Sequence, residues 1–278
     1  MRRLSVSAGI EVDAAELPAQ SPAASITSLV RRHGLVLIRD IPLSRDEITA
    51  LGPELGTPVT PPFLTELSPG GGVSVLERRS ETEEHRASHS TSLVFASGWH
   101  TDWSFLPAPP TLSLLYCEVA PEVGGDTLFC DTALGLEGFS STYQGFLRTL
   151  RGLNTSSRSF SARGVYSRAT VYGAPVSTLE RTIEAIHPVI ADSFVSETEV
   201  VFVNPSYTSY LVELEPHESS AVLGHLYGTL FSDENLLRIN WRNNTLTVWD
   251  NYRFMHRAMN SGIRGERRLL RLNIRTEG

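Results

Sequence analysis

Cysteine is scarce in this sequence, with only Cys117 and Cys130 among 278 residues. The two form no C-x-x-C pair, so the sequence favours two reduced core residues, as in a reducing cytoplasm, over a disulfide or a metal site. Long apolar runs are also missing, since none approaches the roughly 18 residues that span a membrane. No apolar stretch follows Met1-Arg2-Arg3 as it would in a secretory signal. We therefore expect a cytoplasmic protein that has no membrane partner.

Positive charge is limited as well. Lysine and arginine number 24 against 31 aspartates and glutamates, which gives a formal net charge of −7. The one basic concentration is a set of five arginines within 264–275, so nucleic acid is not an expected partner. The hydrophobic content of 41% and the charged content of 20% are ordinary for a globular chain. Because no linker or internal repeat is visible, we expect residues 1–278 to form a single domain.

The apolar spacing predicts many short strands and few helices. Helices are expected at 21–33, 44–55, 133–151 and 216–230. Strands are expected at 35–38, 99–103, 111–117, 126–131, 187–190, 200–204, 237–241, 246–249 and 268–275. This pattern is typical of a mainly β fold with flanking helices (α+β), in which the antiparallel core is a jelly roll or a barrel.

Two stretches lack this periodicity. Residues 57–95 contain proline and glycine clusters and a long polar run, and their position favours an active-site lid over an inert insertion. His85 and His89 lie in this stretch, where solvated loop histidines are more typical than a metal pair. Residues 153–185 are rich in serine, threonine and arginine, and we expect them to form a second covering insertion.

The motif that follows the first of these stretches is Trp99-His100-Thr101-Asp102-Trp103. Side chains two apart on a strand point the same way, so His100 and Asp102 can direct an imidazole nitrogen and a carboxylate oxygen at one point. A second histidine would complete a set of two histidines and one carboxylate, which holds Fe(II) and leaves positions open for other ligands. H-x-D alone is a weak signal, because so short a pattern recurs by chance.

The remaining parts of such a site would come from the C-terminal third. His256 follows a strand that ends in polar residues, although its position alone also fits a structural histidine. Arg267 and Arg271 share one face of the last expected strand, and guanidinium groups clamp carboxylates in a forked geometry. From spacing alone, a solvated basic edge strand is an equally good interpretation of these arginines.

Considered together, four motifs resemble the taurine dioxygenase (TauD/TfdA) family of Fe(II)- and 2-oxoglutarate-dependent oxygenases. The motifs are Trp99-His100-Thr101-Asp102, Gly124-Gly125-Asp126-Thr127-Leu128-Phe129, Trp249-Asp250-Asn251 before His256, and the closing Arg267-x-Leu-x-Arg271. Their order and separations match those of the family, and Arg32–Asp40 is similar to the family's opening segment. The resemblance covers nearly the whole chain.

The resemblance implies a double-stranded β-helix and a role for each matching residue. His100, Asp102 and His256 match the iron ligands of the family. Thr127 and Arg267 match the pair that holds the distal carboxylate of 2-oxoglutarate.

The resemblance also implies residues that meet the substrate. Arg271 matches the arginine that, in taurine-like enzymes, contacts the acidic group of the substrate. Arg268 is a neighbouring rival to Arg267, but the spacings to His256 and Arg271 favour Arg267. The residues that fall near the substrate entrance or pocket lining of the family are Trp103, Ser159, Phe160 and Tyr207.

The chain departs from the taurine-binding enzymes in two places. Pro58–Pro62 contains no histidine and 95–98 contains no asparagine, so two sulfonate contacts are missing and the sequence argues against taurine itself. Related iron halogenases replace the metal carboxylate with a small residue. Because Asp102 is present, hydroxylation is favoured over halogenation.

The resemblance implies Fe(II) as the metal and 2-oxoglutarate and O2 as cosubstrates. The expected reaction is hydroxylation of an unactivated C–H bond of a small, anionic organic substrate, with release of succinate and CO2. Alternatives are desaturation, cyclisation or another oxidation of a natural-product intermediate, and a non-catalytic jelly-roll binding protein. A small molecule is the expected partner, while assembly into a homodimer or homotetramer stays open.

Overall fold

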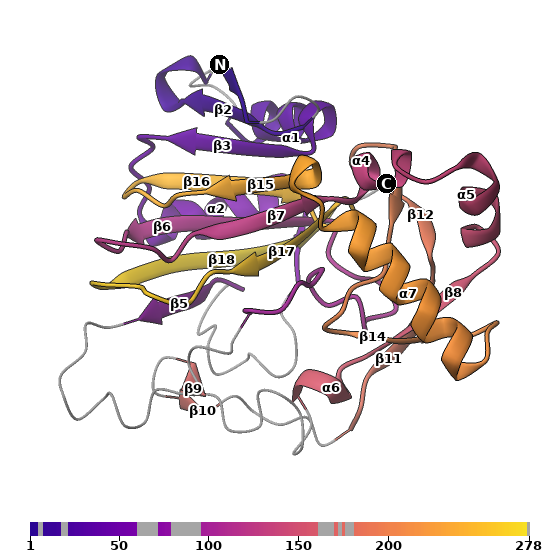
Figure 1. Cartoon of the computed structure of the whole chain (residues 1–278). Coiled ribbons are helices and arrows are strands. Elements are labelled where there is room, and N and C mark those ends of the chain that lie inside the picture. The colour runs from indigo at the N-terminus through magenta and orange to yellow at the C-terminus, as the bar shows by residue number, and fades with distance from the viewer. Residues whose placement is uncertain are drawn as a thin grey trace.

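The computed structural model describes residues 1–4, 8–17, 22–59, 72–78, 96–160, 170–171, 174–175 and 181–276. Its core is a pair of β-sheets, covered on one side by two helices and extended at one end by a smaller layer of strands and helices (Figure 1). Within these ranges, no helix is both long enough and apolar enough to cross a membrane.

The larger sheet is built from segments that lie far apart in the sequence. Its strands are β1 (Arg2–Arg3), β2 (Ile10–Asp13), β3 (Leu35–Arg39), β4 (Thr57–Pro58), β5 (Ser74–Arg78), β6 (Leu112–Val119), β16 (Thr245–Asp250) and β18 (Arg267–Arg275). The order is β1-β2-β3-β16-β6-β18-β4, and β5 also pairs with β18. The β2–β3 pair is parallel, whereas β6 runs antiparallel to both β16 and β18.

The smaller sheet has β7 (Thr127–Asp131) between β15 (Leu236–Ile239) and β17 (Phe254–Ala258). Because side chains alternate along each strand, one face of each sheet turns inward. Phe129 of β7 meets Trp249 of β16 edge to face, with ring centroids 5.1 Å apart, in a buried cluster drawn from both sheets. The predicted mainly β fold with a jelly-roll core is confirmed.

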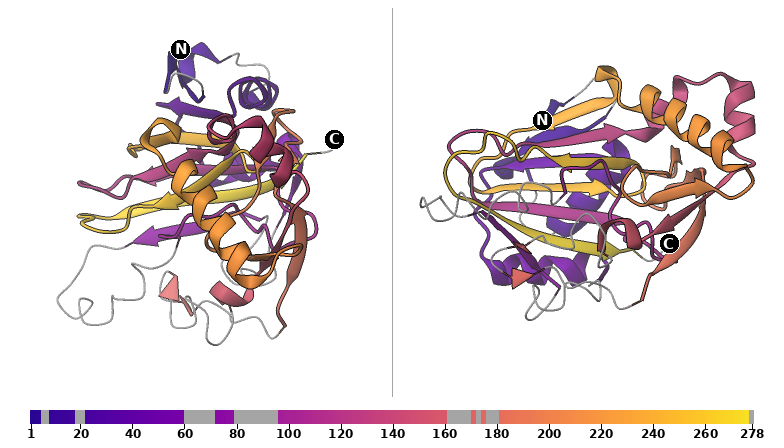
Figure 2. Two further views of the ribbon diagram at one scale, coloured as in Figure 1. Left: turned by 45° about the vertical axis from the view of Figure 1, so that its right-hand side comes forward. Right: turned by 60° about the horizontal axis from the view of Figure 1, so that its bottom comes forward.

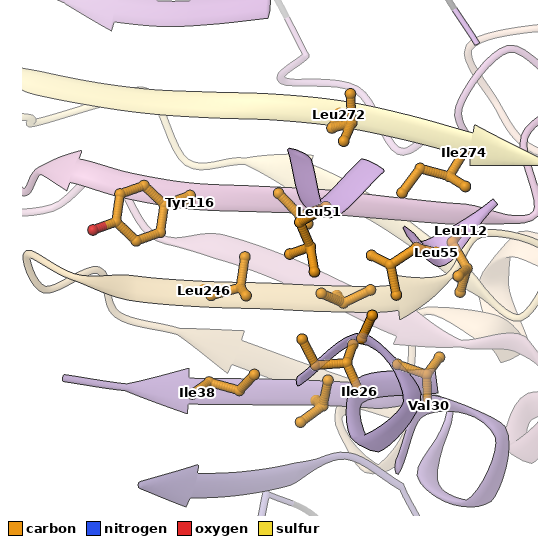
Figure 3. Packing of buried hydrophobic residues seen from close by; sticks show 14 of the residues in the cluster. Ile26, Val30, Ile38, Leu51, Leu55, Leu112, Tyr116, Leu246, Leu272 and Ile274 are labelled. Atoms are coloured by element: carbon orange, nitrogen blue, oxygen red, sulfur yellow. The ribbon is translucent and has the colours of Figure 1, made fainter. Parts of the chain in front are cut away.

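Two helices cover the outer face of the larger sheet, α1 (Pro22–His33) and α2 (Arg45–Leu55). Figure 3 shows Ile26 of α1 and Leu51 of α2 packed over the strands, within one buried cluster. Burying an aliphatic side chain of this size contributes about 1.5–3 kcal/mol, so this cluster is a main source of stability for the sheet.

Local signals set the ends of these helices. Ser44 caps α2 and forms a reciprocal capping box with Glu47, which satisfies backbone N–H groups of the first turn. Gly34 follows α1 with a φ of 74°. A Cβ at Gly34 would lie 2.7 Å from Cε2 of Phe254, so the close approach of the chain to β17 requires glycine.

A third layer continues from one end of the two sheets (Figures 1 and 2). Its elements are α4 (Thr132–Glu137), α5 (Ser141–Leu147), β8 (Arg151–Thr155), α6 (Ser157–Phe160), β11 (Glu184–Pro188), β12 (Ile190–Asp192), β13 (Glu199–Val201), β14 (Thr208–Leu211) and α7 (Pro216–Leu230). The short elements elsewhere are β9 (Thr170–Val171), β10 (Ala174–Pro175) and the 3-10 turns Ala14–Glu16 and Asp233–Asn235. Strand β8 lies between β11 and β14, and α7 packs beside them through Leu226 and Leu230.

The structure corrects several sequence expectations. His100 forms only a single β-bridge, and residues 102–105 are a turn rather than a continuation of a strand. The helix expected at 133–151 is two helices, α4 and α5, because the chain turns at Gly138. The aperiodic stretch 57–95 contains β4 and β5, which pair with β18.

The two expected insertions fall largely beyond the described part of the chain. Residues 60–71 and 79–95 of the predicted lid lie outside the described residues, and so do His85 and His89. Residues 161–169, 172–173 and 176–180 of the second insertion lie outside them as well. At its edges, 153–155 belong to β8 and 184–185 to β11. The covering roles of both stretches stay predictions.

Candidate metal and cosubstrate site

His100 and His256 are brought together by the backbone. His100 N–H donates to the His256 carbonyl at 3.1 Å, and His256 N–H donates to the His100 carbonyl at 2.8 Å. His256 lies within β17 and pairs with Phe129 of β7, so the smaller sheet fixes its position. The two imidazole centroids are 4.2 Å apart.

The turn after His100 places Asp102, and Asn251 holds the backbone of that turn. The Asn251 amide accepts from Asp102 N–H and donates to the Asp102 carbonyl, each at 3.0 Å. The same amide donates to the Pro110 carbonyl at 2.9 Å. Trp103, the next residue, has a φ of 51°, so the chain turns sharply there. A side chain 149 positions away therefore keeps Asp102 beside the histidines.

Three ligand-type atoms of His100, Asp102 and His256 lie within 4.8 Å of one another. Nε2 of each histidine is 3.6 Å from Oδ1 of Asp102. All three side chains are buried. Two imidazoles and one carboxylate are the donor set that binds iron with positions left open.

The protonation states also suit a metal ion. Nδ1 of His100 is 2.8 Å from the Gly98 carbonyl, which can only accept, so Nδ1 carries the proton and Nε2 is free to bind a metal. Burial holds the pKa of His100 well below its ordinary value, and burial lowers the pKa of His256 to about 3. Both imidazoles are therefore neutral in the folded protein, as metal ligands must be.

The two oxygens of Asp102 have different surroundings. Oδ2 accepts hydrogen bonds from the Ser113 hydroxyl and the Asn273 amide, each at 2.8 Å. Oδ1 is buried without a hydrogen bond and instead makes an ion pair with Nη2 of Arg271. A buried carboxylate oxygen directed at two neutral imidazoles fits a cation, so the residues present suit Fe(II).

Thr127 and Arg267 lie at the starts of β7 and β18. The Thr127 hydroxyl accepts a hydrogen bond from Nε1 of Trp241 at 3.1 Å. The Arg267 guanidinium donates to the Gly125 carbonyl at 3.0 Å and to the Asn260 side chain at 3.3 Å. Gly125 is two positions before Thr127, so this contact ties Arg267 to the segment that carries the threonine.

Arg268 has a different environment from its neighbour. Its guanidinium donates to Oε1 of Glu77 at 2.6 and 2.9 Å and lies 3.9 Å from Oε2 of Glu118. Because consecutive strand residues point to opposite faces, Arg268 is directed away from the side that carries Arg267 and Arg271. Its positive charge is therefore paired with two carboxylates of the protein.

Arg271 is buried beside the metal-ligand cluster. Its Nε donates to Oδ1 of Asn273 at 3.0 Å, and its guanidinium carbon lies 5.7 Å from the centre of the Trp103 ring. Burial lowers the pKa of Arg271 to about 10, which leaves the side chain positively charged near neutral pH. Arg271 therefore places a positive charge next to Asp102, with the Trp103 ring beside it.

An aromatic group lies beside His100. The Tyr207 ring is edge-on to His100 at 6.2 Å, and Phe160 stacks on Tyr207 at 6.4 Å. Phe105, which the sequence interpretation missed, contacts Tyr207 at 4.9 Å. Ser159 is buried beside Phe160 in α6. The residues expected to line the substrate pocket are thus gathered near the cluster.

The polar residues that hold the site were also missed, although two carried usable signals. Asn251 belongs to the Trp249-Asp250-Asn251 motif that marked the family resemblance. Asn273 lies on the same face of β18 as Arg271, as strand alternation requires. The partnership of Ser113 with Asp102 depends on chain pairing and left no pattern in the sequence.

The chain matches one protein-family model over residues 3–273. That model is described as taurine catabolism dioxygenase TauD, TfdA family.

Two curated relatives illustrate the range of the matches. An alpha-ketoglutarate-dependent sulfonate dioxygenase of Saccharomyces cerevisiae is 28% identical over 269 residues, covering 93% of this chain and 62% of the relative. Pentalenolactone F synthase of Streptomyces arenae is 28% identical over 179 residues, covering 63% of this chain and 60% of the relative. The chain spans 62%, 48% and 52% of the length of three of the curated proteins it matches.

A solved structure has the same fold over nearly the whole chain. It is that of a putative alpha-ketoglutarate-dependent taurine dioxygenase from Burkholderia xenovorans, with a TM-score of 0.77 and 21% identity. The superposition covers 99% of this chain and 92% of the other.

Proposed function

The chain belongs to the TauD/TfdA dioxygenase family, and we propose that it is an Fe(II)- and 2-oxoglutarate-dependent oxygenase. It hydroxylates an unactivated C–H bond of a small, anionic organic substrate and releases succinate and CO2. The observation that carries this proposal is the buried cluster of His100, Asp102 and His256, in which two neutral imidazoles face one carboxylate oxygen. Bound iron supplies the activation of O2 and the oxidation of 2-oxoglutarate and substrate.

Each residue of the site has a task that its surroundings support. His100, Asp102 and His256 hold the metal. Thr127 and Arg267 bind the distal carboxylate of 2-oxoglutarate by charge-assisted hydrogen bonds. Since Thr127 Oγ1 already accepts from an indole N–H, its own proton is left to donate to that carboxylate.

Arg271 supports the choice of an anionic substrate. It is a buried cation next to the metal ligands, and a buried charge favours a partner of opposite sign. Its guanidinium lies 5.7 Å from the centre of the Trp103 ring, and the planar fork of an arginine matches a carboxylate, sulfonate or sulfate group. The aromatic rings of Phe160 and Tyr207 provide an apolar surface for the carbon part of the substrate.

A second outcome belongs to the same site. The relative named Pentalenolactone F synthase supports desaturation or cyclisation of a natural-product intermediate as the alternative reaction. The metal ligands are the same in both cases, so only the position of the substrate decides between them. A product that gains one oxygen indicates hydroxylation, while one that loses two hydrogens indicates desaturation or ring formation.

The test of this function is formation of succinate that depends on Fe(II), O2 and a substrate. Purified protein is supplied with 2-oxoglutarate and a panel of alkyl sulfonates, sulfate esters and carboxylates. We expect succinate to increase with one of these classes and the increase to be lost in Arg271→Leu. Arg264→Leu, at an exposed position, serves as the matched control and should behave as wild type. Absence of Fe(II)-dependent succinate with every class would favour a non-catalytic binding protein.

The proposal also covers the setting of the enzyme. A single domain over 1–278, a reducing cytoplasm and no nucleic-acid partner are the arrangement we propose. The two cysteines, both buried and unpaired with each other, support the reducing compartment. Light scattering tests assembly into a homodimer or homotetramer.

A further inference from the structure

A buried hydrogen-bond network joins Asp102 to Arg271 through the side chain of Asn273. Its amide donates to Oδ2 of Asp102 at 2.8 Å and to the Ser113 hydroxyl at 2.9 Å, and its oxygen accepts from Nε of Arg271 at 3.0 Å. Asn273 is 2% exposed and Ser113 is fully buried, so water does not compete for these bonds. One amide thus touches both a proposed metal ligand and the proposed anion receptor.

We propose that Asn273 is a positioning residue that couples the two halves of the active site. It holds Asp102 as a ligand through one oxygen and holds Arg271 at the edge of the metal cluster. The inference rests on the proposed function, because it assigns Asp102 to the metal and Arg271 to the substrate anion.

The chemistry of the partners fixes the orientation of the amide. A carboxylate can only accept hydrogen bonds, and a guanidinium can only donate them. Asn273 must therefore direct its NH2 group at Asp102 and its oxygen at Arg271, as observed. Neither a hydrocarbon nor a carboxylate at this position offers a donor to one side and an acceptor to the other.

The donors on Asp102 explain how the carboxylate is oriented. Ser113 and Asn273 are paired residues on neighbouring strands, and both donate to Oδ2. With Oδ2 engaged, Oδ1 is directed at Nε2 of His100 and of His256. Outer residues of this kind fix the direction of a metal ligand and strengthen its binding.

The remaining contact concerns competition for Oδ1. Nη2 of Arg271 makes an ion pair with Oδ1, the same oxygen that faces the two imidazoles. A cation bound in the cluster would therefore compete with Arg271 for Oδ1 of Asp102. Because Nε of Arg271 is engaged by Asn273, it does not join Nη2 in a forked pair with the carboxylate, so Asn273 limits how strongly Arg271 holds Asp102.

The experiment measures the dissociation constant of Mn(II), a metal probe that needs no turnover, by electron paramagnetic resonance on the full chain. The variants are Asn273→Leu, Arg271→Leu and the double variant. Loss of an outer partner of a metal ligand weakens binding by about 10- to 100-fold, which is what we expect for Asn273→Leu. In the Arg271→Leu background the same substitution should have a clearly smaller effect, because the competing cation is gone.

Three further variants separate coupling from general damage. Asn235→Leu removes another buried amide, which donates to Thr229, Leu230 and Ser232, so it should lower the melting temperature and leave Mn(II) affinity unchanged. Ser113→Ala removes a donor to Oδ2 but leaves Asn273 in contact with Arg271, so its effect on Mn(II) affinity should depend less on Arg271 than the effect of Asn273→Leu does. Asn273→Ala is measured beside Asn273→Leu, in case the larger side chain disturbs the strand pair.

The outcomes are distinguishable. If wild type binds Mn(II) and both Asn273 variants bind it equally well, the inference is wrong while the proposed function stands. If the Asn273 effect is the same with and without Arg271, Asn273 acts on the carboxylate alone and the coupling is refuted. If wild type binds no Mn(II), the proposed function itself fails.

Discussion

Substitution of Arg267 by methionine tests the 2-oxoglutarate site most sharply, because Arg268 provides a matched control one position away. In the folded protein Gly125 and Asn260 already hold the Arg267 guanidinium, so a ligand does not have to order it. Arg267→Met therefore removes the charged hydrogen bonds themselves. Arg268→Met removes an ion pair to Glu77 on the opposite face.

The magnitude follows from the bonds lost. A hydrogen bond to a charged group contributes about 1.5–3 kcal/mol, and each 1.4 kcal/mol corresponds to about tenfold in affinity. We expect Arg267→Met to raise the dissociation constant of 2-oxoglutarate by at least about tenfold, reaching roughly a hundredfold if one strong bond is lost. Arg268→Met should change it by less than about threefold, since its partners are carboxylates of the protein.

The assay is anaerobic calorimetric titration of 2-oxoglutarate into Mn(II)-loaded protein. Unfolding temperatures of both variants report any general damage. Equal effects of the two substitutions, or a larger effect of Arg268→Met, would show that the register chosen for the last strand is wrong.

Three other predictions concern the surroundings of the site. Burial lowers the pKa of His256 to about 3, whereas the ordinary pKa of a histidine is near 6.5. Below about pH 6.5 the unfolded chain therefore binds more protons than the folded chain. Metal-free protein should therefore lose stability as the pH falls below that value. In urea unfolding, His256→Gln should remove about 2 kcal/mol of the stability loss between about pH 7.5 and 5. His217→Gln, the control, should not. Trp241→Phe, which removes the donor to Thr127, should weaken 2-oxoglutarate binding severalfold without changing Mn(II) affinity; an unchanged 2-oxoglutarate titration would refute this role. Gly34→Ala should lower the free energy of unfolding by about 1–3 kcal/mol, because φ is 74° and the methyl group meets a buried ring; a neutral result would contradict the packing argument.

The sequence predicted the parts of the fold that depend on local periodicity. The helix at 216–230 and the strand at 246–249 both appear, and the turn before that strand contains Asn244 with a φ of 58°, which asparagine tolerates. The resemblance named the jelly roll, which the facing sheets confirm. These features follow from side-chain spacing and turn chemistry within a few residues.

The features that were missed depend on contacts between distant segments. His100 and Asp102 do meet, but through a β-bridge and a turn held by Asn251, not through a shared strand face. Strand β5 was hidden in an aperiodic stretch because only its pairing with β18 makes it a strand. Strand alternation could have placed Asn273 on the face of Arg271, but its role could not be predicted, because it depends on the partners that the fold provides.

The central claim is tested most directly by an anaerobic titration of the protein with Fe(II) in the presence of 2-oxoglutarate. Binding at the cluster of His100, Asp102 and His256 should produce a weak visible charge-transfer band that saturates at one iron per chain. The band should be absent in His256→Ala and retained in His217→Gln, which changes an exposed histidine of α7. A band that persists in His256→Ala, or that never forms in wild type, would contradict the assignment of the metal centre.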